Sequence, residues 1–158
     1  MKFKAPLDNL VLIISAACFL LFIAISYFVF TNEQLTLVAE ITITSSLWLT
    51  FIFCYLYHPT AYSVSRDVIT IHRPLSSVII SRSDILEIRI PTQAEMRWSI
   101  RTFGVGGLFG YFGKFTNTQL GNMTWYATQR SNYVLLITNT NRIILTPDNP
   151  KNFLAALL

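Results

Sequence analysis

The sequence predicts a membrane-anchored α + all-β protein. An N-terminal two-helix transmembrane hairpin precedes an antiparallel β-barrel or sandwich that a short C-terminal helix closes. Hydrophobic residues make up 53% of the chain and charged residues only 13%, whereas a soluble domain carries about 25% charged residues. Two long uncharged runs fall within the first 57 residues. After them the hydrophobic residues occur in short runs with a period of two, which is typical of strands.

The first run, Leu10 to Phe30, contains 21 residues without a charge. At about 1.5 Å per residue, a helix of this length measures roughly 30 Å and can cross the hydrocarbon core of a bilayer. A buried helix of a soluble protein is seldom apolar on every face over such a length. A cleaved signal peptide would have a shorter apolar region, of about 7–15 residues, and a small-residue cleavage site. We therefore expect a transmembrane helix over residues 10–30.

A second transmembrane helix is expected over residues 35–57, after a loop at residues 31–34. Its uncharged part, Ile41 to Tyr57, has 17 residues, at the short end of the spanning range. Glu40 precedes this part and has more than one interpretation. In mid-membrane a carboxylate would indicate ion or proton transport, whereas near a helix end it reaches the headgroup layer; it is also a candidate for packing against other membrane helices. The short loop makes the two helices antiparallel.

Basic residues before the first helix and after the second set the predicted orientation, because the loop between the helices carries only an acidic residue. By the positive-inside rule both termini face the cytoplasm. Residues 1–9 then form a cytoplasmic N-terminus, the loop is extracytoplasmic, and residues 60–158 form a cytoplasmic domain. The residues that carry this inference are Lys2, Lys4, Glu33, Arg66 and Arg73.

The region after residue 60 is expected to form six to eight short antiparallel strands. The runs that predict strands are AYSVSRDVITIHRP, SSVIIS, DILEIRI, GKFTN, NMTWYAT, YVLLIT and RIILT. The chain closes with PDNPKNFLAALL, in which Asp148 or Asn149 can cap a helix and Pro150 suits its first turn. Four apolar residues fall on one face of that helix: Phe153, Leu154, Leu157 and Leu158.

The stretch RTFGVGGLFGYFGKFTN, residues 101–117, holds five of the six glycines. A mononucleotide-binding loop would need glycine in place of Leu108 and a hydroxyl residue in place of Phe115, and the dinucleotide pattern would need glycine in place of Phe109. Neither motif is present, so nucleotide binding is not expected. Two interpretations remain. The glycines mark positive-φ turns, bulges or corners, or the segment is a long flexible loop that enters the membrane interface or grips an apolar partner.

Basic residues accompany this stretch. No acidic residue occurs between Glu95 and Asp148, and from Pro59 onward ten Lys/Arg oppose five Asp/Glu, a net charge of +5. A basic face close to an anionic leaflet gains about 1 kcal/mol per charge; the alternative is a solvated exterior that follows the positive-inside bias. The candidate contacts for a partner or lipid are Arg97, Arg101, Gly104, Gly106, Gly107, Leu108, Phe109, Gly110, Tyr111, Phe112, Gly113 and Lys114.

The glycine-rich stretch, WYAT, VLLIT and ILTPDNPKNFLAAL together resemble bacterial pleckstrin-homology (PH)-like domains that follow one or more membrane helices. The resemblance covers roughly residues 60–158. It implies a PH-like barrel of two nearly orthogonal sheets with a C-terminal helix closing one end, in a protein of the bacterial inner (plasma) membrane. Eukaryotic members that bind phosphoinositides use clustered basic residues on the first hairpin. Here that hairpin has Arg66 beside Asp67 and then Arg73, so the cluster is missing.

No catalytic, cofactor or metal site is expected. His58 and His72 lack a metal-ligand spacing, and the carboxylates after residue 60 are scattered through strands and loops. Cys18 and Cys54 lie inside apolar runs without a CxxC spacing, which indicates packing.

The sequence therefore predicts a non-catalytic binding or assembly module whose ligand it does not name. The module would engage a protein partner or the anionic inner leaflet. The alternative is a structural subunit that packs through its transmembrane hairpin and Glu40, and a transporter or enzyme has only Glu40 in its favour. The expected partners are the lipid bilayer, an unidentified membrane or cytoplasmic protein and a second copy of the chain, without nucleic acid or nucleotide.

Overall fold

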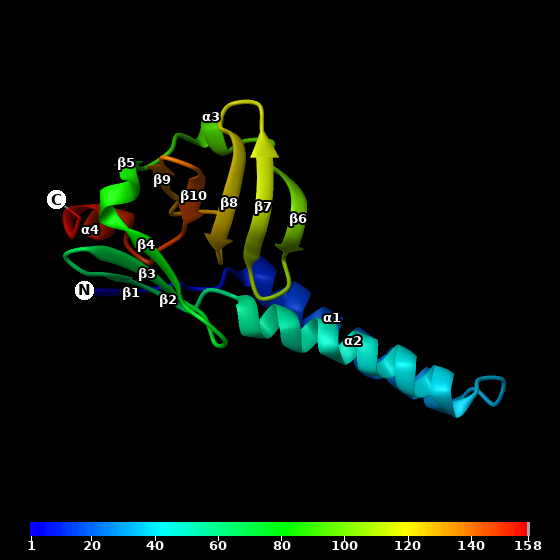
Figure 1. Ribbon diagram of the computed structural model, residues 1–158. Coiled ribbons are helices and arrows are strands. Elements are labelled where there is room, and N and C mark those ends of the chain that lie inside the picture. The colour runs from blue at the N-terminus through cyan, green and yellow to red at the C-terminus, as the bar shows by residue number, and fades with distance from the viewer. Residues whose placement is uncertain (158) are drawn as a thin grey trace.

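Two long helices project side by side from a β-rich domain (Figure 1). The computed structural model describes residues 1–157. Helix α1 spans Asn9–Thr31 and α2 spans Leu37–Tyr57. The side chain of Asp8 accepts a backbone hydrogen bond at 2.7 Å and caps α1, and Thr36 caps α2. Both helices are long and apolar enough to cross a membrane.

Aromatic side chains hold the two helices together. Phe19 and Phe22 of α1 contact Trp48 and Phe51 of α2, with ring centroids 5.7 to 6.4 Å apart. The indole Nε1–H of Trp48 donates to the hydroxyl of Ser26 at 3.1 Å across the same interface. No residue of α2 is buried, so the outer face of the pair is an uncovered apolar surface, as expected of helices that face lipid.

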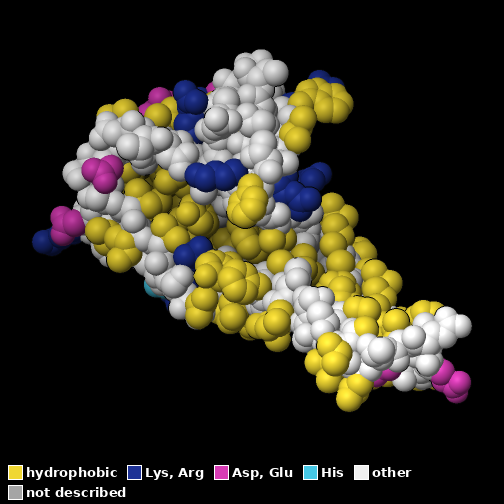
Figure 2. All heavy atoms as spheres, turned by 45° about the vertical axis from the view of Figure 1, so that its right-hand side comes forward, with side chains coloured by type: hydrophobic (Ala, Val, Ile, Leu, Met, Phe, Trp, Pro, Cys, Tyr) yellow, Lys and Arg dark blue, Asp and Glu magenta, His cyan; other side chains and the backbone are white. Residues whose placement is uncertain are grey.

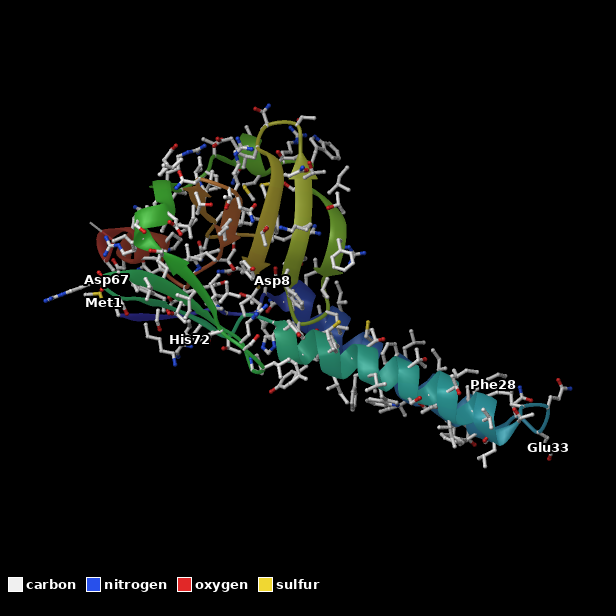
Figure 3. The ribbon with its side chains drawn as sticks, viewed as in Figure 1. Met1, Asp8, Phe28, Glu33, Asp67 and His72 are labelled. Atoms are coloured by element: carbon white, nitrogen blue, oxygen red, sulfur yellow. The ribbon has the colours of Figure 1, made fainter. Side chains whose placement is uncertain are left out.

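A four-stranded antiparallel sheet has the order β1-β2-β3-β4. Its strands are β1 (Lys2–Lys4), β2 (Ala61–Val64), β3 (Val68–His72) and β4 (Val78–Ser81). Strand β1 was not predicted from the sequence, because three residues with two lysines carry no readable alternation. Since β1 precedes α1 and pairs with β2, the domain takes chain from both sides of the helix pair. Figure 3 places Met1 and Asp67 at the end of the domain away from the helices.

A six-stranded sheet has the order β5-β9-β10-β8-β7-β6. Its strands are β5 (Ile85–Arg89), β6 (Ile100–Gly106), β7 (Tyr111–Asn117), β8 (Gly121–Ala127), β9 (Val134–Thr138) and β10 (Arg142–Leu145). A 3₁₀ turn at Arg82–Asp84 joins the two sheets, and α3 (Gln93–Met96) leads from β5 into β6. The closing helix α4 spans Pro150–Ala155, with Asn149 as its N-cap.

The prediction of two sheets with a C-terminal helix is confirmed, but the barrel is not closed and the pairing is not wholly antiparallel. Among residues 1–157 the two sheets share no strand pairing, and β10 runs parallel to β8. Alternation along a strand specifies which face is buried, whereas closure and strand direction depend on long-range pairing that leaves the same local pattern. Within residues 60–157 there are also nine strands, more than the six to eight expected there.

The core explains why two of the predicted strands are continuously apolar. Val134 and Leu136 of β9 face a cluster between the sheets and α4, while Leu135 faces a second cluster on the outer side of the six-stranded sheet. β10 alternates in the same way. Strands buried on both faces read as unbroken hydrophobic runs. Phe153 of α4 is fully buried in the first cluster, and its ring lies 5.1 Å from that of Phe3 in β1.

Candidate functional site

The glycine-rich stretch forms a β-hairpin rather than a long loop. β6 and β7 pair up to Gly106 and Tyr111, and the backbone N–H of Gly107 donates to the carbonyl of Gly110 at 2.8 Å. Only Leu108 and Phe109 lie between these two glycines. The expectation of a long flexible loop was therefore wrong. Tyr111 and Phe112, two of the proposed loop contacts, are buried in β7.

The tip of this hairpin packs against both long helices at their domain ends (Figure 1). The backbone N–H of Phe109 donates to the hydroxyl of Ser15 in α1 at 2.9 Å. The Phe109 ring lies 4.9 Å from Phe51 and 5.4 Å from Tyr55 of α2. It thus extends the aromatic cluster that joins the two helices. At Gly107 a Cβ would lie 2.9 Å from Ile14 of α1, so glycine permits this close approach.

A second contact ties α1 to the domain. One carboxylate oxygen of Asp8 caps α1, and the other accepts the backbone N–H of Arg130 at 3.1 Å from the connection between β8 and β9. Figure 3 places Asp8 at the junction of helix and domain, with Phe28 and Glu33 at the far end of the helices. The hairpin tip and Asp8 therefore hold the six-stranded sheet in a defined position relative to the helices.

A pair of facing glycines shapes the hairpin behind the tip. Gly104 of β6 pairs with Gly113 of β7, and their φ angles are +110° and +121°. A Cβ on Gly104 would lie 2.3 Å from the carbonyl oxygen of Phe112, and one on Gly113 would lie 2.4 Å from that of Phe103. The interpretation of the glycines as sites of positive φ is confirmed at both positions.

The outer strand β6 presents apolar and basic side chains on an exposed edge. Phe103, Ile100 and the preceding Trp98 are 78%, 66% and 77% exposed. Arg97 and Arg101 are also exposed, and the Arg97 guanidinium lies 5.5 Å from the centre of the Trp98 ring. We call these five residues the β6 edge. In Figure 1, β6 is the strand on the side toward which the two helices extend.

Helix α3 positions the start of the β6 edge. Glu95 and Thr92 form a capping box at its N-terminus, and both oxygens of Glu95 accept hydrogen bonds from the Arg89 guanidinium of β5. The hydrogen bonds from Arg89 and Thr92 lower the pKa of Glu95 to about 2. Glu95 therefore stays ionised and is paired with Arg89, which also forms a salt bridge of 2.9 Å with Glu87.

Lys114 does not belong to the β6 edge but lines a groove between α2 and the six-stranded sheet. The groove has a volume of about 640 Å³, and its walls come from the last turns of α2 and from β6, β7 and β8. Lys114 Nζ donates to the hydroxyl of Thr124 at 2.8 Å, and Asn141 Nδ2 donates to the same oxygen at 2.6 Å. Figure 2 shows hydrophobic side chains between the helices and the domain, with basic side chains beside them.

Arg73 and Tyr126 complete the polar side of this groove. The Arg73 guanidinium lies 5.2 Å from the centre of the Tyr57 ring and 6.0 Å from that of Tyr126. Burial raises the pKa of Tyr126, and the charge of Arg73 acts in the opposite direction. Among the described residues neither Arg73 nor Lys114 forms a salt bridge.

Several of these residues were not predicted, and others were predicted as one set that the structure divides. Arg97, Arg101 and Lys114 were grouped as candidate contacts, but Arg97 and Arg101 lie on the β6 edge and Lys114 lines the groove. Trp98 was not predicted, and Arg73 was not predicted as a site residue, because exposure and long-range contacts leave no local signal. Glu40 lies in the first turn of α2, at the end away from the domain, where the helix dipole favours a negative charge. Within residues 1–157 no group of three or more metal-ligating side chains gathers.

Comparison with known proteins identifies the β-rich region. The family model described as the bacterial PH domain matches residues 60–158, which is more than half of the chain. No curated protein and no solved structure matches the chain. Within residues 1–157, the matched region contains nine of the ten strands and the closing helix α4, and it is the region whose sequence resembles bacterial PH-like domains. The chain therefore belongs to the bacterial PH domain family.

Proposed function

We propose that this protein is a membrane-anchored, non-catalytic binding module of the bacterial plasma membrane. The two long helices span the membrane with both termini in the cytoplasm, and the PH-like domain engages the anionic inner leaflet through its β6 edge. The observation that carries this proposal is the docked hairpin tip. It holds β6 on the side of the domain toward which the helices extend, which supports a position of the exposed aromatic and basic residues of the edge beside the bilayer.

The chemistry of the β6 edge fits the interface of an anionic membrane. Tryptophan is favoured at the headgroup level because its ring is amphipathic. Arginine close to an anionic leaflet contributes about 1 kcal/mol per charge. The hairpin that binds phosphoinositides in eukaryotic relatives corresponds to β2–β3, and its Asp67 lies at the end of the domain away from the helices (Figure 3). The proposed contact therefore uses a different surface from that of those relatives.

A fluorescent label at position 98 tests this placement. In a chain with Cys18→Ser and Cys54→Ser, Trp98→Cys would carry an environment-sensitive dye, and the protein would be reconstituted in vesicles of phosphatidylglycerol and phosphatidylcholine. We expect the emission to shift to the blue and brominated lipids to quench it, because the dye enters the interface. Salt should weaken the effect, since exposed charges are screened.

Leu86→Cys is the matched control. Leu86 is 68% exposed on β5, at the opposite edge of the same sheet from β6. A dye there should emit as in water. Equal emission and equal quenching at the two positions would contradict the proposed contact between the β6 edge and the leaflet.

One observation favours the alternative, a structural subunit that packs through its helices. Thr42, Ser46 and Thr50 recur at four-residue spacing on α2 and are all exposed, and small residues at this spacing are typical of helix interfaces in membranes. If this alternative holds, replacing all three by leucine should reduce cross-linked oligomers in native membranes. Glu40→Gln tests the helix-packing contact predicted from the sequence, and unchanged oligomer size in both variants would remove the alternative.

A further inference from the structure

The groove beside α2 is an amphipathic cavity with one wall on a membrane-type helix. Phe53, Cys54 and Tyr57 of α2 form that wall, and Phe103 and Val105 of β6 lie among the residues of the facing side. Phe53 is 61% exposed although it lines the groove. The volume of the groove, about 640 Å³, lies in the range of ligand-binding pockets, about 300–1,000 Å³. The chain itself thus leaves the aromatic lining of the groove unfilled.

The floor of the groove contains backbone rather than side chains at one point. Gly104 and Gly113, the facing pair of the hairpin, both line it. Glycine within a strand is typical of places where a ligand approaches the backbone closely. Any side chain here would clash with the opposite strand, so the floor stays open as long as the hairpin keeps this geometry.

The groove carries unpaired positive charge and no negative charge. Lys114 donates one hydrogen bond to Thr124, which leaves two ammonium hydrogens free. Arg73 donates from Nε and Nη2 to Ser76 and keeps Nη1 without a partner among the described residues. No Asp or Glu lines the groove. A phosphate oxygen is therefore a suitable acceptor for both residues.

We infer that this groove binds one anionic phospholipid taken from the bilayer that surrounds α2. Its phosphate contacts Arg73 and Lys114, and an acyl chain lies along Phe53 and Phe103. This inference rests on the proposed function, because it requires α2 to stand in the membrane. A partner protein's apolar segment would leave the two cations unpaired, and the choline group of a zwitterionic lipid would add positive charge beside them.

Native mass spectrometry of the full chain released from mild detergent tests the inference. Titration with phosphatidylglycerol and with phosphatidylcholine of the same acyl chains should show one tightly held phosphatidylglycerol. The double variant Arg73→Gln with Lys114→Gln should bind it roughly thirtyfold more weakly, the order of magnitude expected for losing two charges near an anionic headgroup. Inorganic phosphate alone should not compete, because the acyl chain contributes part of the binding.

Three further variants keep the test interpretable. Arg73→Lys retains the charge and should retain the lipid, which separates loss of charge from loss of fold. Val105→Trp fills the groove from β6 and should lower lipid retention without removing a charge. Arg97→Gln with Arg101→Gln removes two charges of the β6 edge, which does not line the groove at these positions, and should leave the bound lipid unchanged.

Two outcomes would overturn the inference: equal retention of phosphatidylglycerol and phosphatidylcholine, or undiminished retention in the Arg73→Gln, Lys114→Gln variant. Failure here is distinguishable from failure of the proposed function. A dye at position 98 that enters the interface, in a protein that holds no lipid in the groove, would leave the membrane contact standing and remove the lipid site alone.

Discussion

Replacing Gly113 by alanine is expected to destabilise the domain by about 3 kcal/mol or more. An L-residue at a φ near that of Gly113, +121°, costs of the order of 1–3 kcal/mol. The added Cβ would also lie 2.4 Å from the backbone carbonyl oxygen of Phe103. A backbone atom cannot rotate away as a side chain can, so β6 and β7 would have to separate. For a chain of this size we expect the melting temperature to fall by roughly 6–12 °C.

Gly106→Ala is the matched control on the same hairpin. Gly106 does not adopt a positive φ, and a Cβ there would meet only the flexible end of the Arg101 side chain, at 3.3 Å. Its melting temperature should therefore stay close to that of the wild type, because alanine is at least as favourable as glycine within a strand. Thermal unfolding of both variants in the same detergent, followed by near-ultraviolet circular dichroism, makes the comparison. Equal melting temperatures would contradict the close approach at Gly113.

The helices and most strands were readable from the sequence because each leaves a local pattern. Twenty-one uncharged residues in a row predict a long apolar helix, and alternation such as that of Ile69 and Ile71 predicts a half-buried strand. The cap and first turn of α4 follow from Asn149 and Pro150 in the same way. These features depend on neighbours within a few residues, and the structure has all of them.

Features that depend on distant partners were not readable. β1 owes its conformation to pairing with β2, about sixty residues away along the chain. The parallel pairing of β10 with β8 arises because β10 enters between β8 and β9, and local alternation is the same for either direction. The open edges of the sheets likewise depend on which strands meet. A prediction of closure therefore needed information that the alternation pattern does not carry.

The site was predicted in part for the same reason. Glycines at positions 104 and 113 were correctly interpreted as positive-φ positions, since glycine within a strand has few other causes. The contact between the hairpin tip and the two long helices could not be predicted. An apolar tip has the same sequence whether its partner is the chain's own helix pair, another protein or the membrane. The apolar character that suggested membrane or partner binding is used, at Phe109, for an internal contact.

Replacing Phe109 by alanine is expected to release the domain from the helices while leaving both parts folded. Truncating a fully buried phenylalanine costs about 3–5 kcal/mol, and because Phe109 is half-buried we expect the docked state to lose about 2 kcal/mol. This corresponds to roughly a thirtyfold shift toward an undocked arrangement. The backbone preference changes little, since both residues are L-amino acids at the φ of 58° found here.

Pulsed electron paramagnetic resonance measures this release. Spin labels at Thr31→Cys, on the far end of α1, and Leu86→Cys, on β5, in the chain without its native cysteines should give a narrow distance distribution for the parent protein and a broad one for Phe109→Ala. Ile100→Ala is the matched control, because Ile100 lies on the same hairpin, is 66% exposed and does not line the groove beside α2. A distribution as narrow in Phe109→Ala as in the control would show that Asp8 and β1 hold the domain in place without the aromatic contact. The β6 edge would then owe its position beside the helices to the start of the chain and not to the glycine-rich hairpin.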